Sequence, residues 1–278
     1  MSLSDSLAAV PEWLRLAGGC AMAAFVAVAT LVFRRLRAGL PVIPQAATRP
    51  VPWGGSDVAI VVFTYLSAAT LASAVLGTSP GLESMLAANS AINLAVSLVA
   101  IGWLMLRGAE LADLGLAPVR PRRDLELAIA GWAFVLAPLL ALAAALNAVV
   151  AYEHPVVDLL GENRSLGAVA TVVIAAVVAA PIAEELFFRR ILLGWLEKAL
   201  PSANGAAAIL VSAVAFALLH QGQGLAYIPL VPLGLVLGFI ASRTGTILPC
   251  ILLHAFFNAV SVGLLLADSG PAPVPAGG

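Results

Sequence analysis

Eight long apolar stretches, separated by short polar segments, make up most of the chain. They cover residues 16–33, 58–76, 86–106, 125–150, 167–200, 206–221, 227–242 and 247–267. A helix needs roughly 20 apolar residues to cross the hydrocarbon core of a bilayer. Several stretches are rich in Val and Ile, but a lone strand would leave its backbone groups unpaired in lipid, so helices are favoured. The pattern therefore predicts an all-α, polytopic membrane helix bundle with about eight transmembrane helices.

The segments between the apolar stretches divide the chain. Proline-rich loops, "AGLPVIPQAATRPVPWGG" and "LGLAPVRPRRD", follow the first and third stretches and cannot continue a helix. We expect helices 1–4 within residues 1–160, helices 5–8 within 161–267, and a disordered tail at 268–278, where "SGPAPVPAGG" is of low complexity.

The composition excludes a water-soluble protein. Of 278 residues, 62% are hydrophobic and only 10% are charged, whereas a soluble domain carries about 25% charged residues. The net charge is −1, so no basic surface points to nucleic acid. We therefore expect the chain to be embedded in a lipid bilayer.

Positive charge is concentrated in the loops after the first, third, fifth and seventh stretches. These loops contain Arg34, Arg35, Arg37, Arg49, Arg107, Arg120, Arg122, Arg123, Lys198 and Arg243. The positive-inside rule places them in the cytoplasm and both termini outside. The Ala- and Arg-rich, Lys-poor composition is typical of a GC-rich bacterial genome, so we expect a multi-pass protein of a bacterial inner membrane.

A few ionisable side chains interrupt the later apolar stretches. They are Glu184, Glu185, Arg189, Arg190, His220 and His254, with the polar Asn258 close to the last of them. Such groups are costly inside a membrane and are functional candidates by default. Glu185 and Arg189 are four residues apart on one helix and can form an ion pair, which could also be purely structural.

The remaining polar groups can meet at one depth. His254 and Asn258 are four residues apart and share one helix face. Phe216 and His220 have the same spacing. Helix lengths allow Glu184, His220, His254 and Asn258 to converge. A carboxylate and a histidine could take a proton from a water that attacks a carbonyl, while a second histidine and an asparagine donate to the oxyanion. We find no intramembrane Ser or Cys clearly paired with a base, so amide hydrolysis by activated water is the favoured chemistry.

Three motifs in order resemble a known family. Glu184-Glu185-x-x-x-Arg189, Phe216-x-x-x-His220 and His254-x-x-x-Asn258 are similar to the signature of the CPBP family. It comprises the CAAX-processing (Rce1-type) and bacteriocin-processing intramembrane proteases, also called the Abi family. The resemblance covers roughly residues 165–266. Arg190 departs from it, since relatives often have glycine there.

The resemblance implies roles for these residues. Glu184 and His220 would activate the hydrolytic water, and His254 with Asn258 would form the oxyanion site. Glu185 and Arg189 would support the helix, and Phe216 belongs to the second motif. The family has been described both as metalloproteases and as metal-independent glutamate proteases. No HExxH spacing makes zinc a firm expectation, but a divalent metal such as zinc would use Glu184, His220 and His254.

The sequence leaves other functions open. The same carboxylates and histidines could line a proton or cation path of a transporter, although the chain shows no inverted repeat and no paired broken helices. A non-catalytic membrane chaperone or scaffold is the third possibility. For a protease, the substrate would be a membrane-associated protein or peptide, cleaved at a prenylated C-terminus, a bacteriocin leader or a sorting tag. Separately, Gly234-x-x-x-Gly238 predicts close helix packing.

Overall fold

The computed structural model describes residues 11–47, 49–77, 80–150, 159–160 and 164–268, and every regular element in these ranges is a helix. The predicted all-α fold is confirmed. The helices are α2 (Glu12–Arg37), α3 (Gly55–Leu76), α4 (Leu82–Leu106), α5 (Pro121–Asn147), a continuous helix over Leu166–Ala199, α10 (Ala206–Leu218), α11 (Tyr227–Thr244) and α12 (Leu248–Asp268). Of the tail predicted at 268–278, Asp268 is the last residue of α12, and residues 269–278 lie outside the described residues.

Seven of these helices are long and apolar enough to cross a membrane, and α10 is the exception. The sequence predicted a helix over 206–221, but α10 ends at Leu218, so His220 lies in the following turn. The sequence Gln-Gly-Gln-Gly at 221–224 follows in the turn, where Gly224 adopts a positive φ of 61°.

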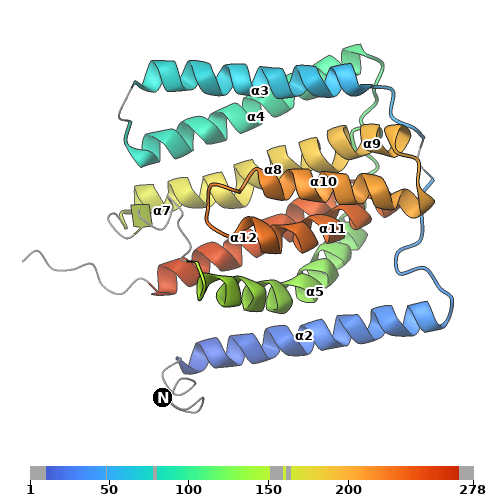
Figure 1. Cartoon of the computed structure of the whole chain (residues 1–278), viewed down its shortest axis with the longest axis vertical. Coiled ribbons are helices and arrows are strands. Elements are labelled where there is room, and N and C mark those ends of the chain that lie inside the picture. Colours follow the sequence, from blue (N-terminus) through green and yellow to red (C-terminus); the bar gives the residue numbers. More distant parts are fainter. Residues whose placement is uncertain (1–10, 48, 78–79, 151–158, 161–163, 269–278) are drawn as a thin grey trace, which may run out of the picture.

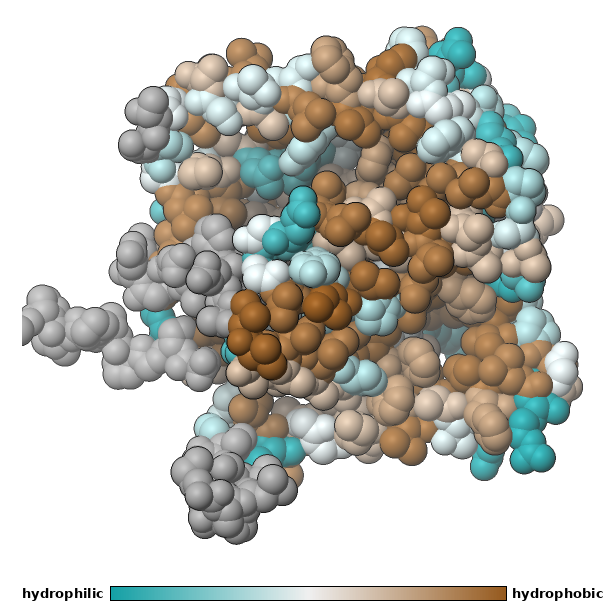
Figure 2. Space-filling model, in the orientation of Figure 1, coloured by the Kyte–Doolittle hydropathy of each residue, from teal (hydrophilic) through white to brown (hydrophobic). Residues whose placement is uncertain are grey.

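The helices pack in layers along the long axis of the molecule (Figure 1). The α3–α4 hairpin forms one end and contacts the long helix Leu166–Ala199 through α4. This long helix, α10, α11 and α12 form the middle. At the other end, α5 packs against α11 and α12, and α2 packs against α5. Apolar side chains cover much of the face seen in Figure 2, as expected for a protein surrounded by lipid.

The four connections that are close to the positive residues in the sequence lie on the same side of the bundle, at the right in Figure 1. They connect α2 to α3, α4 to α5, the long helix to α10, and α11 to α12. Hydrogen bonds hold the first loop against the long helix. Trp53 Nε1 donates to the Ile191 carbonyl at 2.9 Å, and Lys198 Nζ donates to the Val51 and Trp53 carbonyls. The shared end agrees with the charge pattern, while its cytoplasmic location stays a prediction.

The long helix is not α-helical along its whole length. It consists of α7 (Leu166–Val173), η1 (Ile174–Ala179), α8 (Ala180–Glu185), η2 (Leu186–Leu192) and α9 (Leu193–Ala199), where η1 and η2 are π-helical. Ser165 caps its start by accepting a hydrogen bond from the Ala168 amide. The two adjacent glutamates are therefore on a short α-helical segment between two wider turns.

Two glycines allow α10 and α11 to pack closely. A Cβ atom added to Gly234 would lie 3.0 Å from both the Cα and the Cβ of Ala213. One added to Gly238 would lie 3.1 Å from Cγ2 of Ile209. The predicted close packing at the Gly-x-x-x-Gly sequence is confirmed.

A larger side chain at Gly234 should separate α10 from α11. We expect Gly234→Leu to lower the free energy of unfolding by about 1–3 kcal/mol, because the backbone of Ala213 cannot move away easily. Thermal unfolding in detergent measures the change. Gly102→Leu is the control, since no atom lies within 4 Å of a Cβ added there. Equal melting temperatures for the two variants would contradict the close packing.

Candidate active site

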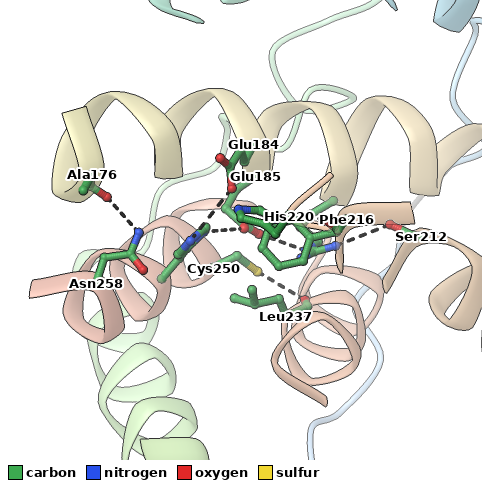
Figure 3. A network of polar contacts seen from close by, with 11 residues as sticks. Ala176, Glu184, Glu185, Ser212, Phe216, His220, Leu237, Cys250 and Asn258 are labelled. Carbon is green, nitrogen blue, oxygen red and sulfur yellow. Dashed lines mark hydrogen bonds and ion pairs between the residues drawn. The ribbon is translucent and has the colours of Figure 1, made fainter. Parts of the chain in front are cut away.

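The carboxylate of Glu185 lies at the centre of a buried polar network (Figure 3). Its Oε2 accepts a hydrogen bond from Arg189 Nε at 3.0 Å, and its Oε1 lies 2.9 Å from His254 Nδ1. The side chains of Glu185 and Arg189 are 0% exposed and that of His254 is 4% exposed. The predicted Glu185–Arg189 ion pair is thus present, and it extends to a histidine of α12.

Phe216 of α10 packs against both basic members of this network. The Arg189 guanidinium lies 4.6 Å from the centre of the Phe216 ring, a cation–π geometry. The ring centres of His254 and His220 lie 5.7 Å and 5.3 Å from the same ring. Phe216 therefore fixes the spacing between the ion pair and the two histidines.

Glu184 occupies a different environment from Glu185. One residue along a helix rotates a side chain by about 100°, and Glu184 is 23% exposed where Glu185 is buried. Its Oε2 lies 3.9 Å from His254 Nε2, which is too far for a direct hydrogen bond but within the range of an ion pair. His220 is also within electrostatic range of this carboxylate. The two glutamates thus lie on opposite sides of the His254 ring.

The hydrogen-bond partners define which imidazole nitrogens are available. His220 Nδ1 lies 3.2 Å from the Phe216 carbonyl, which can only accept, so Nδ1 carries the proton and Nε2 is left as a base. In the same way, His254 Nδ1 donates to the Glu185 carboxylate, and its Nε2 faces Glu184. A buried carboxylate that orients a histidine in this way is a recurrent arrangement in hydrolytic sites.

Asn258 is placed by the π-helical segment η1. The Ala180 amide donates to the Ala175 carbonyl, five residues earlier. The next amide in this series would be that of Pro181, but proline has no N–H to donate to the Ala176 carbonyl. Asn258 Nδ2 supplies the missing donor, at 2.8 Å from Ala176 O (Figure 3). One N–H of the expected oxyanion donor is therefore used structurally, and its second N–H remains.

The structure brings most of the sequence-predicted residues together. Glu184, Glu185, Arg189 and His254 form one cluster, with Phe216 and His220 beside it. Asn258 lies one turn further along α12 and contacts the long helix at Ala176. Arg190 does not join this cluster, since its Nε donates to the Asp113 carbonyl.

Sequence analysis missed three residues around the network. Ser212 Oγ donates to the Phe188 carbonyl of η2 at 2.7 Å and lies 3.5 Å from Arg189 Nη1. Tyr65 of α3 is within electrostatic range of Glu184. Trp53 donates to the Ile191 carbonyl of η2. Only Ser212, four residues before Phe216 in an apolar helix, carried a signal that the spacing rules could have used.

The described residues do not offer a metal site. No group of three or more His, Cys, Asp or Glu side chains among them is arranged to hold a metal ion. The expected set of Glu184, His220 and His254 is not arranged as a ligand shell, although His254 Nε2 is free of hydrogen bonds to the described residues. In this arrangement the residues do not fit a zinc ion.

Comparison with known proteins gives one match. Residues 166–260 match the family model of the Rce1-like, type II CAAX prenyl endopeptidases. The matched segment begins with the long helix and includes all three motifs. Neither the curated proteins nor the solved structures gave a match to the chain.

Removal of the buried arginine should destabilise the bundle. Arg189→Met leaves the Glu185 carboxylate buried beside a single histidine, so we expect a loss of about 3–5 kcal/mol in the free energy of unfolding. Thermal unfolding in detergent and the yield of folded protein measure this. Arg122→Met is the control, because Arg122 is 93% exposed and pairs only with Glu126. A wild-type melting temperature for Arg189→Met would show that the ion pair is dispensable.

Removal of the Asn258 amide should loosen the long helix at its π-helical segment. Asn258→Ala leaves the half-buried Ala176 carbonyl without this donor, at an expected cost of about 1–3 kcal/mol. Hydrogen exchange of residues 174–181 should become faster than in the wild type. Ser261→Ala is the control, because its hydroxyl bonds only within α12, to the Phe257 carbonyl. Unchanged exchange and stability would mean that Asn258 does not hold this segment.

Proposed function

Residues 166–260 form an Rce1-like domain of the type II CAAX prenyl endopeptidase family, which is a family of peptidases, and from this premise we propose an intramembrane endopeptidase. Its substrate is a peptide segment of a membrane-associated protein. Glu184 and His220 activate a water molecule that hydrolyses the peptide bond. The observation that carries this proposal is the His254 ring, held by the buried Glu185 carboxylate with its free Nε2 facing Glu184.

The first step is attack of water on the scissile carbonyl. Glu184 is the partly exposed carboxylate of the cluster, so water reaches it while Glu185 stays dry. The water oxygen bonds to the carbonyl carbon, its proton passes to Glu184 or to His220 Nε2, and the carbonyl oxygen becomes an oxyanion. General-base help of this kind contributes about 10²–10⁴-fold to a rate.

The second step is collapse of the tetrahedral intermediate. The oxyanion accepts hydrogen bonds from the second Asn258 N–H and from His254 Nε2 when that nitrogen carries a proton. The C–N bond then breaks, and the proton taken from the water passes to the leaving nitrogen. Glu185 and Arg189 keep His254 in place throughout, and none of these steps requires a metal ion.

The proposed orientation places the arginine-containing loops in the cytoplasm of a bacterial cell and both termini outside. Positive residues dominate this end of the bundle, which is the side that the positive-inside rule assigns to the cytoplasm. The substrate classes that follow from the family and the sequence are a prenylated C-terminus, a bacteriocin leader and a C-terminal sorting tag.

Substitution of the water-activating residues should abolish cleavage without unfolding the protein. We expect Glu184→Gln and His220→Ala each to slow cleavage by about 100-fold or more. The assay follows three tagged substrates, one of each class, co-expressed in the membrane and analysed by mass spectrometry for new termini. Glu126→Gln, on the exposed surface of α5, is the matched control.

Two outcomes would contradict the proposal. Equal cleavage by Glu184→Gln at wild-type protein levels would remove Glu184 from the reaction. No cleavage of any substrate by the wild type, together with proton or cation flux in reconstituted vesicles that Glu184→Gln abolishes, would instead establish the transporter. A chelator added to active wild-type protein tests metal dependence separately, and we expect cleavage to continue.

A further inference from the structure

A cavity of about 730 Å³ opens at the arginine-containing end of the bundle. Three loops line it: the one before α3, the one between α4 and α5, and the short turn between α11 and α12. Arg190 enters it from the long helix, and Arg120 and Arg123 from the start of α5. None of the residues of the candidate active site lines this cavity, so it requires a separate explanation.

Arg190 is the most informative residue of this cavity. It is only 7% exposed, and its one hydrogen bond runs from Nε to the Asp113 carbonyl. Its two Nη groups donate to no described residue. They are not among the fully buried side-chain nitrogens that lack a hydrogen bond, so they keep some exposed surface. A nine-tenths buried arginine that lines a cavity and has both Nη groups unbonded is suited to an anionic acceptor.

The side chains that line the cavity carry one more positive than negative charge, and Glu197 of α9, outside the lining, also acts on Arg190. Four arginines and three carboxylates line it. Arg49 is neutralised by Asp113 at 2.6 Å and Glu110 at 3.0 Å, and its hydrogen bonds hold the pKa of Asp113 below the ordinary value. The guanidiniums of Arg120 and Arg123 bond to no described residue.

The start of α5 adds to this field. Its first turn directs amide groups and the positive end of the helix dipole toward the same region, where Asp124 already accepts one hydrogen bond from the Arg120 amide. One excess positive charge suits one monoanionic group.

A small apolar pocket adjoins the cavity. It has a volume of about 110 Å³ and shares Pro118, Asp124 and Thr246 with the larger cavity. Leu116, Ile247 and Ile251 line its other side. A polar anion site beside an apolar pocket is suited to an amphiphile, and basic pockets between transmembrane helices on the cytoplasmic side are typical sites for lipid head groups.

We propose that this cavity binds a phosphate group, and that the adjoining apolar pocket makes an anionic phospholipid its source. Arg190 contacts the phosphate from the long helix, and Arg120 and Arg123 contact it from the start of α5. A bound lipid would hold the three loops together at the end of the long helix. This proposal does not depend on the peptidase reaction.

The test measures lipid binding to the purified full chain in detergent. Short-chain phosphatidylglycerol should raise the melting temperature and appear as a bound species in native mass spectrometry. Phosphatidylcholine of equal chain length has the same phosphate but a compensating positive charge, so it should bind more weakly. Glycerol phosphate at equal concentration distinguishes a soluble phosphate from a lipid, because it lacks the acyl chains.

Variants assign the binding to this cavity. We expect Arg120→Gln with Arg123→Gln to weaken phosphatidylglycerol about 100-fold, at about tenfold per arginine. Arg122→Gln is the matched control, since Arg122 is on the same turn but does not line the cavity. Arg190→Met, used only if its melting temperature without lipid equals that of the wild type, should also weaken binding.

Three results would overturn the proposal. Equal phosphatidylglycerol affinity in the double variant and Arg122→Gln would place the lipid elsewhere. Equal stabilisation by phosphatidylcholine would remove the role of net charge. Equal stabilisation by glycerol phosphate would keep the phosphate site but remove the lipid.

Discussion

The pairing of the Glu185 carboxylate with Arg189 and His254 is the interaction on which the second half of the bundle depends. A charge in an apolar environment is tolerated only when it is paired and hydrogen-bonded. Glu185 has both oxygens occupied, one by its own helix and one by α12. Phe216 of α10 covers the guanidinium. The long helix, α10 and α12 therefore stabilise one another, because α12 supplies the second hydrogen-bond partner of Glu185 and α10 supplies the ring against the Arg189 guanidinium.

The two π-helical segments link this pairing to the proposed active site. Each widens the long helix and leaves carbonyl groups that other parts of the chain satisfy: Asn258 at Ala176, Ser212 at Phe188 and Trp53 at Ile191. π-helical turns are frequent at functional sites. Here they flank the segment that carries Glu184 and Glu185, so residues that hold the helix also determine where the carboxylates point.

Much of the fold and part of the site could be predicted from the sequence. The apolar stretches predicted the helices, and the four-residue spacing predicted the ion pair of Glu185 with Arg189. The bond from Asn258 to Ala176 could not be predicted, because it depends on a shift from four- to five-residue hydrogen bonding before Pro181. The contact of Trp53 with Ile191 joins residues 138 positions apart, and local patterns contain no information about such pairs.

The short length of α10 has a consequence for the surrounding bilayer. Its 13 residues span about 20 Å, whereas the hydrocarbon layer is about 30 Å thick. The turn that follows, with Gln221 and Gln223, thus ends below the far surface of an unperturbed bilayer. Several backbone amides of this turn are hydrogen-bonded within it, but the side-chain amides of two glutamines are costly to leave unpaired in hydrocarbon. The lipid beside α10 must therefore thin, or water must enter there, and either response hydrates the membrane at the depth of His220. The proposed hydrolysis inside a membrane needs a route for water, and a helix shorter than the hydrocarbon layer would provide one.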